Sequence, residues 1–188
     1  MLVIVSAPSG TGKTTLCRML MRDFNCLELS ISSTTRAPRG FGRDAEVPGK
    51  DYVFISKKEF EEAIKRDEFA EWAEVHGNYY GTSKKTIEGL FQKGKSVLLD
   101  IDVQGAELLR KAYPGQNFSV FISPPSIEEL ERRLRARQTD SDNTINTRLN
   151  NAKIEMAESS HFDVVIVNDD LEKAYKDMKE AVEKQLAK

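Results

Sequence analysis

The chain has 188 residues, of which 39% are apolar and 31% are charged. Single hydrophobic cores commonly serve chains of ~100–200 residues, so this length favours one domain with room for small subdomains. The apolar fraction and the eleven glycines exclude a disordered or collagen-like chain. The formal net charge of −2 argues against the overall basic excess of a protein that coats nucleic acid.

The sequence carries no sign of export or membrane insertion. No apolar run approaches the ~20 residues of a membrane span. Met1 leads directly into an apolar run, without the basic stretch and cleavage site of a secretory signal. We therefore expect a cytoplasmic protein with no membrane, nucleic-acid or obligate protein partner. Cys17 and Cys26 lack disulfide-framework or metal-site spacing, and both are predicted to be reduced, structural thiols.

Buried strands are predicted at four places. Residues 2–5 form a short β-branched run, and further apolar runs occupy 96–101, 118–122 and 164–167. None of these runs alternates between apolar and polar residues, which is typical of strands that are buried on both faces.

Helices are predicted between these strands. Residues 14–22 carry apolar side chains at helical spacing directly after the first strand. A second helical stretch covers 106–113, and a third begins at Ser126, which has Glu129 three residues later in capping-box spacing. A last helix follows residues 168–170 and carries one apolar stripe. Strands that alternate with helices predict an α/β fold with a parallel sheet.

Two stretches break this alternation. Residues 33–83 contain turn signals, short aromatic runs and a helix capped by Ser56 and Glu59, which predicts an inserted mixed α/β lobe. Residues 132–148 are polar and arginine-rich, and we expect a mobile basic lid there. The remaining residues, 1–32 and 84–188, are expected to form the core.

The strongest motif is a phosphate-binding loop. It consists of Ala7, Pro8, Ser9, Gly10, Thr11, Gly12, Lys13 and Thr14. This is P-loop spacing with alanine in place of the first glycine. A strand precedes the loop and a helix follows it, so backbone N–H groups would converge on a polyphosphate. Lys13 would reach the β- and γ-phosphates, and the Thr14 hydroxyl would bind Mg²⁺.

A P-loop alone is compatible with GTPases, motor ATPases, small-molecule kinases and nucleotide kinases. The Asn-Lys-x-Asp signature with which GTPases read guanine is absent from the sequence, which argues against a GTPase switch. A glycine-rich turn without a ligand is the structural alternative.

Residues suited to a second phosphate and a base follow the P-loop. Arg36 and Arg39 flank a turn fixed by Pro38, and guanidinium groups bind phosphate bidentately. Together, the P-loop, this arginine pair and the run from Asp100 to Gly105 resemble the motifs of guanylate kinases. The resemblance extends over almost the whole chain. The resemblance implies a P-loop three-layer fold with a GMP-binding lobe at 33–83 and an arginine-rich lid at about 126–150.

The resemblance also implies roles for single residues. Glu71 would accept hydrogen bonds from guanine, with Ser32 and Thr82 on the O6 side. The GMP phosphate would be held by Arg36, Arg39, Tyr52 and Tyr80, with Asp102 at the mouth of that site. Asp100 would act on Mg²⁺ through water. ATP would be bound by the P-loop with Thr15, by the lid arginines Arg133, Arg137 and Arg148, and by Asn168 on the adenine side. The expected catalytic residues are Lys13, Arg36, Arg133, Arg137 and Arg148.

Several of these residues have simpler structural interpretations. The tyrosines, including Tyr79, would serve equally well as core aromatics, and Glu71 as a surface carboxylate. The lid arginines would also suit a solvated helix face on which they pair with glutamates. His76 and His161 match no catalytic position and are expected to be structural or surface residues. The connection 40–50 is a few residues longer than is usual in the family, and Arg43 within it is not expected to be a ligand.

The implied reaction is reversible transfer of the γ-phosphoryl group of ATP to GMP, and to dGMP, giving ADP and GDP in purine nucleotide metabolism. Mg²⁺ is the implied cofactor and ATP the co-substrate. Two alternatives stay open at this stage: a scaffold-like module that binds a protein, and a kinase for another monophosphate or a sugar phosphate.

Overall fold

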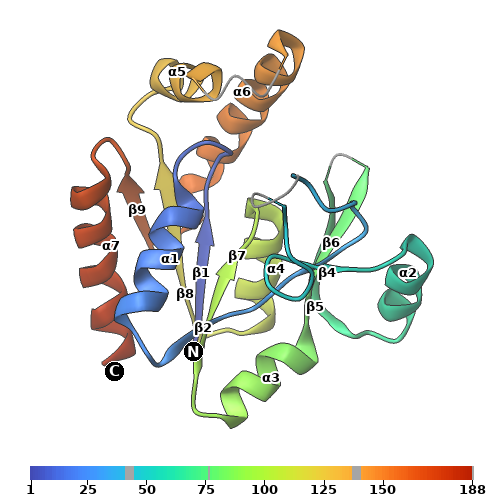
Figure 1. Cartoon of the computed structure of the whole chain (residues 1–188). Helices are drawn as coiled ribbons and strands as arrows, with labels where there is room; N and C mark the ends of the chain where they lie inside the picture. Colours follow the sequence, from blue (N-terminus) through green and yellow to red (C-terminus); the bar gives the residue numbers. More distant parts are fainter. Residues whose placement is uncertain (41–44, 76, 137–140, 188) are drawn as a thin grey trace.

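The computed structural model describes residues 1–40, 45–75, 77–136 and 141–187 (Figure 1). Arg43, His76 and Arg137 lie outside this part of the chain.

A parallel sheet of five strands forms the centre of the molecule, in the order β2-β7-β1-β8-β9. The strands are β1 (Leu2–Ser6), β2 (Leu27–Leu29), β7 (Ser96–Asp100), β8 (Asn117–Ser123) and β9 (Val164–Val167). The strand β1 is buried along its whole length because it lies between two other strands and under helices on both faces. The four predicted strands are confirmed. The short β2 was not predicted, since three residues carry no readable pattern.

Helices cover both faces of this sheet, which confirms the α/β fold class (Figure 1). On one face, α1 (Lys13–Asp23) and α7 (Leu171–Leu186) pack over Val3, Val5 and Val120. On the other face, α3 (Lys84–Gln92) and α4 (Val103–Ala112) pack over Leu2, Ile4 and Leu99. The helix α3 was not predicted, and α4 begins three residues before its predicted start at residue 106. The helix α4 begins at Val103 because the Asp102 carboxylate caps its first turn.

A second sheet lies beside the first, in the order β4-β3-β6-β5. Its strands are β3 (Ser33–Thr34), β4 (Val53–Phe54), β5 (Phe69–Val75) and β6 (Asn78–Ser83). One pair is parallel and two are antiparallel, so the sheet is mixed. The helix α2 (Lys57–Lys65) packs on it through a small core of Phe60, Ala63 and Phe69. The predicted capping box of Ser56 and Glu59 is confirmed.

Two further helices, α5 (Ile127–Ala136) and α6 (Asp142–Ala157), stand above the end of the central sheet where β1 runs into α1 (Figure 1). They share an apolar core of Leu130, Leu134, Ile145, Leu149 and Ala152. Most of the polar segment 132–148 is therefore helical, and a 3-10 turn, η2 (Glu158–His161), follows α6.

Ser126 caps α5, as predicted, but only half of the capping box is present. The Ser126 hydroxyl accepts from the Glu129 N–H at 3.2 Å. The Glu129 carboxylate does not complete the box, because it binds Arg132 and Arg133 instead.

The two cysteines differ in their surroundings. Cys17 is buried in the core under α1, whereas Cys26 is exposed, so only Cys17 has the structural role predicted for both. Both thiols are free. Within the described residues, no helix is long and apolar enough to cross a membrane.

Candidate active site

A cavity of about 500 Å³ lies where the carboxyl ends of β1 and β7 face the second sheet and α6. Most of the predicted site residues line it: Ala7, Pro8, Ser9, Gly10, Thr11, Gly12, Lys13, Thr14, Thr15, Ser32, Arg39, Tyr52, Glu71, Tyr80, Asp100, Asp102 and Arg148. Arg36 and Thr82 are not part of this lining, but each donates a hydrogen bond to a residue that is, Arg36 to Tyr80 and Thr82 to Glu71.

The P-loop joins β1 to α1 in a conformation that requires glycine at two positions. Gly10 and Gly12 have φ values of +101° and +89°, which side chains rarely adopt. A Cβ on Gly10 would lie 3.0 Å from Leu134 of α5, and one on Gly12 would lie 2.7 Å from the Asn168 amide. The Thr11 hydroxyl closes the turn by donating to the Pro8 carbonyl at 2.8 Å. This loop presents the amino end of α1 to the cavity, a geometry that suits a phosphate.

Lys13 is held by the end of β7. Its ammonium lies 2.6 Å from Asp100 and donates to the Ile101 carbonyl at 3.1 Å. Burial alone would lower the pKa of Lys13, but the ion pair with Asp100 outweighs burial and raises the pKa. Lys13 is therefore a fixed positive charge at the cavity wall.

The same carboxylate also reaches Thr14, whose hydroxyl donates to Asp100 at 3.4 Å. The described residues contain no cluster of three His, Cys, Asp or Glu side chains that would hold a metal alone. Mg²⁺ usually takes one or two protein oxygens and keeps waters and substrate phosphates as its other ligands. The hydroxyl and carboxylate oxygens of Thr14 and Asp100 therefore fit a magnesium site completed by a substrate.

Arg36 projects from the end of β3 and is fixed by a carboxylate that the sequence analysis did not assign. Its guanidinium forms a fork with Glu46, at 2.9 and 2.7 Å, and donates to the Tyr80 hydroxyl at 3.1 Å. The group also lies 5.2 Å from the centre of the Tyr52 ring. The hydrogen bonds of Glu46 raise the pKa of Arg36, and those of Arg36 lower the pKa of Glu46. The aromatic side chains Tyr52 and Tyr80 thus frame a cation.

Glu71 is buried, with 6% of its surface exposed, so the surface interpretation is wrong. It lies on β5 opposite Thr82 of β6, whose hydroxyl donates to Glu71 Oε1 at 2.5 Å. Burial raises the pKa of Glu71 to about 7; Asp102 adds to the rise, and the Thr82 hydrogen bond opposes it. A buried carboxylate with one oxygen left for a ligand suits a group that presents N–H donors.

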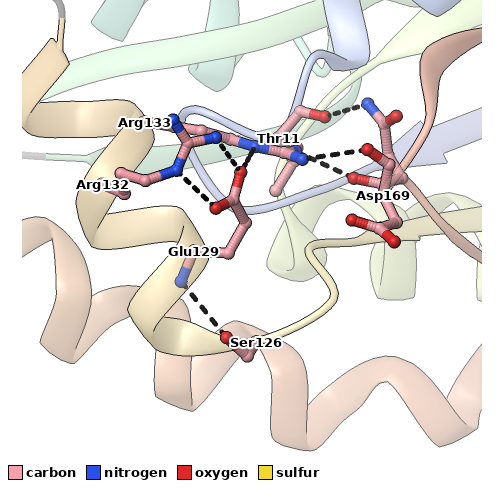
Figure 2. A network of polar contacts seen from close by, with 7 residues as sticks. Thr11, Ser126, Glu129, Arg132, Arg133 and Asp169 are labelled. Atoms are coloured by element: carbon pink, nitrogen blue, oxygen red, sulfur yellow. Dashed lines mark hydrogen bonds and ion pairs between the residues drawn. The ribbon is translucent and has the colours of Figure 1, made fainter.

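Arg133 and Asn168 form a link between α5 and the P-loop (Figure 2). The Arg133 guanidinium donates to the Glu129 carboxylate at 2.7 Å and to the Asn168 carbonyl at 2.8 Å. The Asn168 amide in turn donates to the Thr11 carbonyl at 2.6 Å. Figure 2 shows Arg133 between Glu129 and Asp169. Neither Arg133 nor Asn168 is among the residues that line the cavity, so in this structure the expected direct contacts are not made there.

The other basic side chains of α5 lie on a solvated helix face, where they pair with acidic side chains. Arg132 pairs with Glu129, and Arg135 pairs with Glu131 and Asp142. The pair between Arg135 and Asp142 joins α5 to α6.

Three side chains at helical spacing on α6 line the cavity: Arg148, Asn151 and Glu155. Glu155 was not among the predicted site residues, although its position seven residues after Arg148 places both on one face of the helix. Burial raises the pKa of Glu155 to about 7, with Lys13 opposing the rise and Asp102 adding to it. The cavity therefore has an acidic side chain between the P-loop and α4.

Tyr79 and His161, to which the sequence assigned no binding or catalytic role, do not line the cavity. Tyr79 packs its ring against Phe60 at 5.3 Å between ring centres. His161 is exposed and pairs with Glu158.

Comparisons with known proteins agree with this geometry. The model of a family described as guanylate kinase matches residues 1–185. A guanylate kinase of Geobacter sulfurreducens is 50% identical over 181 residues, which cover 96% of this chain and 87% of that protein. One of Dechloromonas aromatica is 51% identical with the same two coverages.

A solved structure supports the same assignment. The crystal structure of guanylate kinase from Anaplasma phagocytophilum aligns with a TM-score of 0.79 and 33% identity, and the alignment covers 100% of this chain and 87% of that one. The resemblance inferred from the motifs is confirmed. The chain therefore belongs to the guanylate kinase family and is a nucleoside monophosphate kinase.

Proposed function

We propose that this chain transfers the γ-phosphoryl group of ATP to GMP, and to dGMP, in a reversible Mg²⁺-dependent reaction that gives ADP and GDP. The observation that carries the proposal is the single cavity that contains both Lys13 of the P-loop and the buried carboxylate of Glu71. One end of this cavity suits a polyphosphate and the other suits a base with N–H donors.

Guanine matches Glu71 better than other bases do. Its N1–H and exocyclic amine are adjacent donors, whereas adenine lacks that pair, and a buried carboxylate left unpaired costs a few kcal/mol. Ser32 and Thr82 lie on the same side of the site and would serve the O6 edge. Arg36, Arg39, Tyr52 and Tyr80 would bind the phosphate of the acceptor, with Asp102 near the ribose end.

The donor nucleotide would lie on the P-loop, with its phosphates against the backbone from Ser9 to Thr15. Thr14 and Asp100 would hold Mg²⁺, Asp100 through water. When bound, this ion supplies positive charge at the phosphate oxygens. Arg133, Arg137 and Arg148 would approach the same phosphates from the lid, while Asn168 would act at the adenine end.

The chemistry asks mainly for positioning. Phosphoryl transfer passes through a loose transition state in line with the attacking oxygen, and an oxygen of the GMP phosphate is already an anionic nucleophile. No side chain therefore has to remove a proton. Lys13, Arg36 and the lid arginines would stabilise the charge on the migrating group and hold the two phosphates in line.

Closure of a lobe and a lid over the core would keep water away from the phosphoryl group that is transferred. We propose that residues 33–83 form the GMP-binding lobe and residues 126–150 the lid, both moving over the core formed by 1–32 and 84–188. The apolar core of the α5–α6 pair and that of α2 are separate from the two cores of the central sheet, which supports such movement, while β5 of the lobe keeps its contact with α4.

An assay of ADP release tests the proposal directly. ATP and Mg²⁺ are supplied with GMP, AMP, UMP or CMP, and the products are identified. We expect release that depends on GMP and yields GDP. Faster turnover of another monophosphate would overturn the assignment of the acceptor. GMP binding without turnover would instead favour a scaffold-like module.

A pair of variants on one strand tests guanine reading. Glu71→Gln should lower kcat/KM for GMP far more than for AMP or UMP, since the amide loses one acceptor for the guanine donors. Glu74→Gln is the matched control, because Glu74 lies on the same strand but is exposed. Equal losses on all monophosphates would contradict direct reading of guanine.

A further inference from the structure

Gly105 lies inside a helix at a position where its backbone does not require glycine. It belongs to the first turn of α4, and it is absent from the glycines with positive φ. Glycine is a poorer helix former than alanine, by up to about 1 kcal/mol in a helix interior, so α4 itself gives no reason for glycine here. Its presence therefore calls for a reason outside the helix.

The reason lies in the neighbouring sheet. A Cβ on Gly105 would stand 2.8 Å from Glu71 Oε2 and 3.2 Å from Glu71 Cδ. Real Cβ atoms essentially never approach another heavy atom to less than 3.0 Å. The Glu71 carboxylate thus rests against the bare backbone of α4.

Glu71 is consequently fixed from two sides. The Thr82 hydroxyl holds Oε1 at 2.5 Å, and the backbone of Gly105 lies against Oε2. Asp102 adds a constraint, because its carboxylate accepts from the Gly105 N–H at 2.8 Å and so locks the first turn of α4. A side chain at position 105 would therefore have to displace the Glu71 carboxylate from its bond to Thr82 or toward the cavity that Glu71 lines.

We propose that Gly105 is a specificity-determining position: by lacking a side chain, it sets how deeply the Glu71 carboxylate lies and so places that carboxylate for the acceptor base. Gly105 is a positioning residue, since it acts through Glu71. This inference rests on the proposed function, in which Glu71 reads guanine.

Alanine at this position would push the carboxylate toward the cavity. Hydrogen bonds to a base require distances of about 2.7–3.2 Å, and a misplacement of about 1 Å can cost roughly 100-fold in rate. We expect Gly105→Ala to raise KM for GMP by roughly 10- to 100-fold and to lower the preference for GMP over AMP by a similar factor. KM for ATP should stay within about twofold, because the P-loop is untouched.

The chain offers a matched control in Gly89. This glycine is also helical, in α3, but a Cβ there would meet nothing within 4 Å. Gly89→Ala should leave both KM values unchanged and should raise Tm slightly, as alanine favours the helix.

A compensating change distinguishes positioning from general damage. Glu71→Asp shortens the side chain by one methylene and makes room for the new methyl group. Alanine at 105 should therefore reduce kcat/KM for GMP much less in the Glu71→Asp background than in the wild-type background. The same comparison decides the case if Gly105→Ala alone fails to fold, because the double variant should then fold.

The wild-type assay separates this inference from the proposed function. If the wild-type chain does not phosphorylate GMP, both are overturned. If it does, the inference alone is overturned by a folded Gly105→Ala variant with unchanged GMP preference, by equal losses for GMP and ATP, or by a double variant that shows full additivity or fails to fold.

Discussion

The two regions that we propose to bind phosphate are built in different ways. The P-loop presents backbone atoms on the central sheet, with large apolar cores on both sheet faces. The Arg36 region presents side chains from a sheet whose own buried core consists of Phe60, Ala63 and Phe69. A backbone site depends on loop conformation, whereas a side-chain site depends on partners that orient each group.

Both regions nevertheless fix their cation with a carboxylate. Lys13 lies 2.6 Å from Asp100, and Arg36 lies 2.7 Å from Glu46. The lysine contributes a point charge, while the guanidinium forms a planar fork with defined directions. A side chain that supplies only a positive charge should therefore replace Arg36 less well than it would replace Lys13.

The largest expected effect is that of Lys13→Ala. Removing the P-loop ammonium should lower kcat by roughly 10³-fold, because the charge of the transferring group loses its main fixed partner. GMP affinity should remain close to the wild-type value, since Lys13 stands at the other end of the cavity. Steady-state kinetics and calorimetric titration of GMP measure the two effects, and an unchanged kcat would contradict the assignment.

The second-largest effect is expected at Arg36, whose guanidinium forms a fork with Glu46. Arg36→Lys keeps the charge but loses the planar geometry, so KM for GMP should rise roughly 30- to 100-fold with little change for ATP. Arg66→Lys is the matched control, because Arg66 is an exposed arginine of the same lobe that pairs with Glu68. A lysine variant with normal GMP kinetics would remove the contrast between the two regions.

Glu46→Gln should have a smaller effect of the same kind. The amide no longer offers two charged oxygens to the guanidinium, so Arg36 loses part of its orientation and KM for GMP should rise about tenfold. Glu68→Gln serves as the control, since its carboxylate pairs with an arginine on the surface. A fall in KM would mean that Glu46 competes with the substrate phosphate instead of orienting Arg36.

The smallest effect is one of stability. The pKa of Glu71 is raised from 4.5 to about 7, so the folded state binds this proton more tightly than the unfolded chain does. The contribution of Glu71 to stability is therefore lost as pH rises through this window. Glu71→Gln lacks that loss and should raise Tm at pH 8 by about 2–4 °C, with a smaller gain at pH 5. Thermal melts at both values provide the measurement, and a gain that shrinks with pH would contradict the burial argument.

The contrast between the regions explains what could be predicted. The P-loop was predicted residue by residue because its chemistry lies in contiguous residues between a strand and a helix. Glu71 was assigned only through resemblance, since its burial depends on β6 and α4, which are distant in sequence. Gly105 needed the structure, because its contact with Glu71 crosses from a helix to another sheet.

The misses have equally local causes. The helix α3 contains Gly89, which weakens its helical signal. Arg133 was assigned to the ATP phosphates only through the resemblance. Its direction in the structure depends on Glu129 of its own helix and on carbonyls of the loop after β9, which is distant in sequence. Glu46 was given no role, because its fork with Arg36 spans ten residues and leaves no periodic pattern.

Two hydrogen bonds between Arg39 and Glu46 make the geometry of the Arg36 region largely independent of the length of the chain between these two residues. The Glu46 N–H donates to the Arg39 carbonyl at 2.9 Å, and the Arg39 N–H donates to the Glu46 carboxylate at 2.7 Å. Residues 39 and 46 are thus hydrogen-bonded to each other and close a loop. Doubling the length of a closed loop costs only about 0.6 kcal/mol. The pairing of Arg39 with Glu46 therefore allows connections of different length between these two residues to meet at the same place beside the cavity.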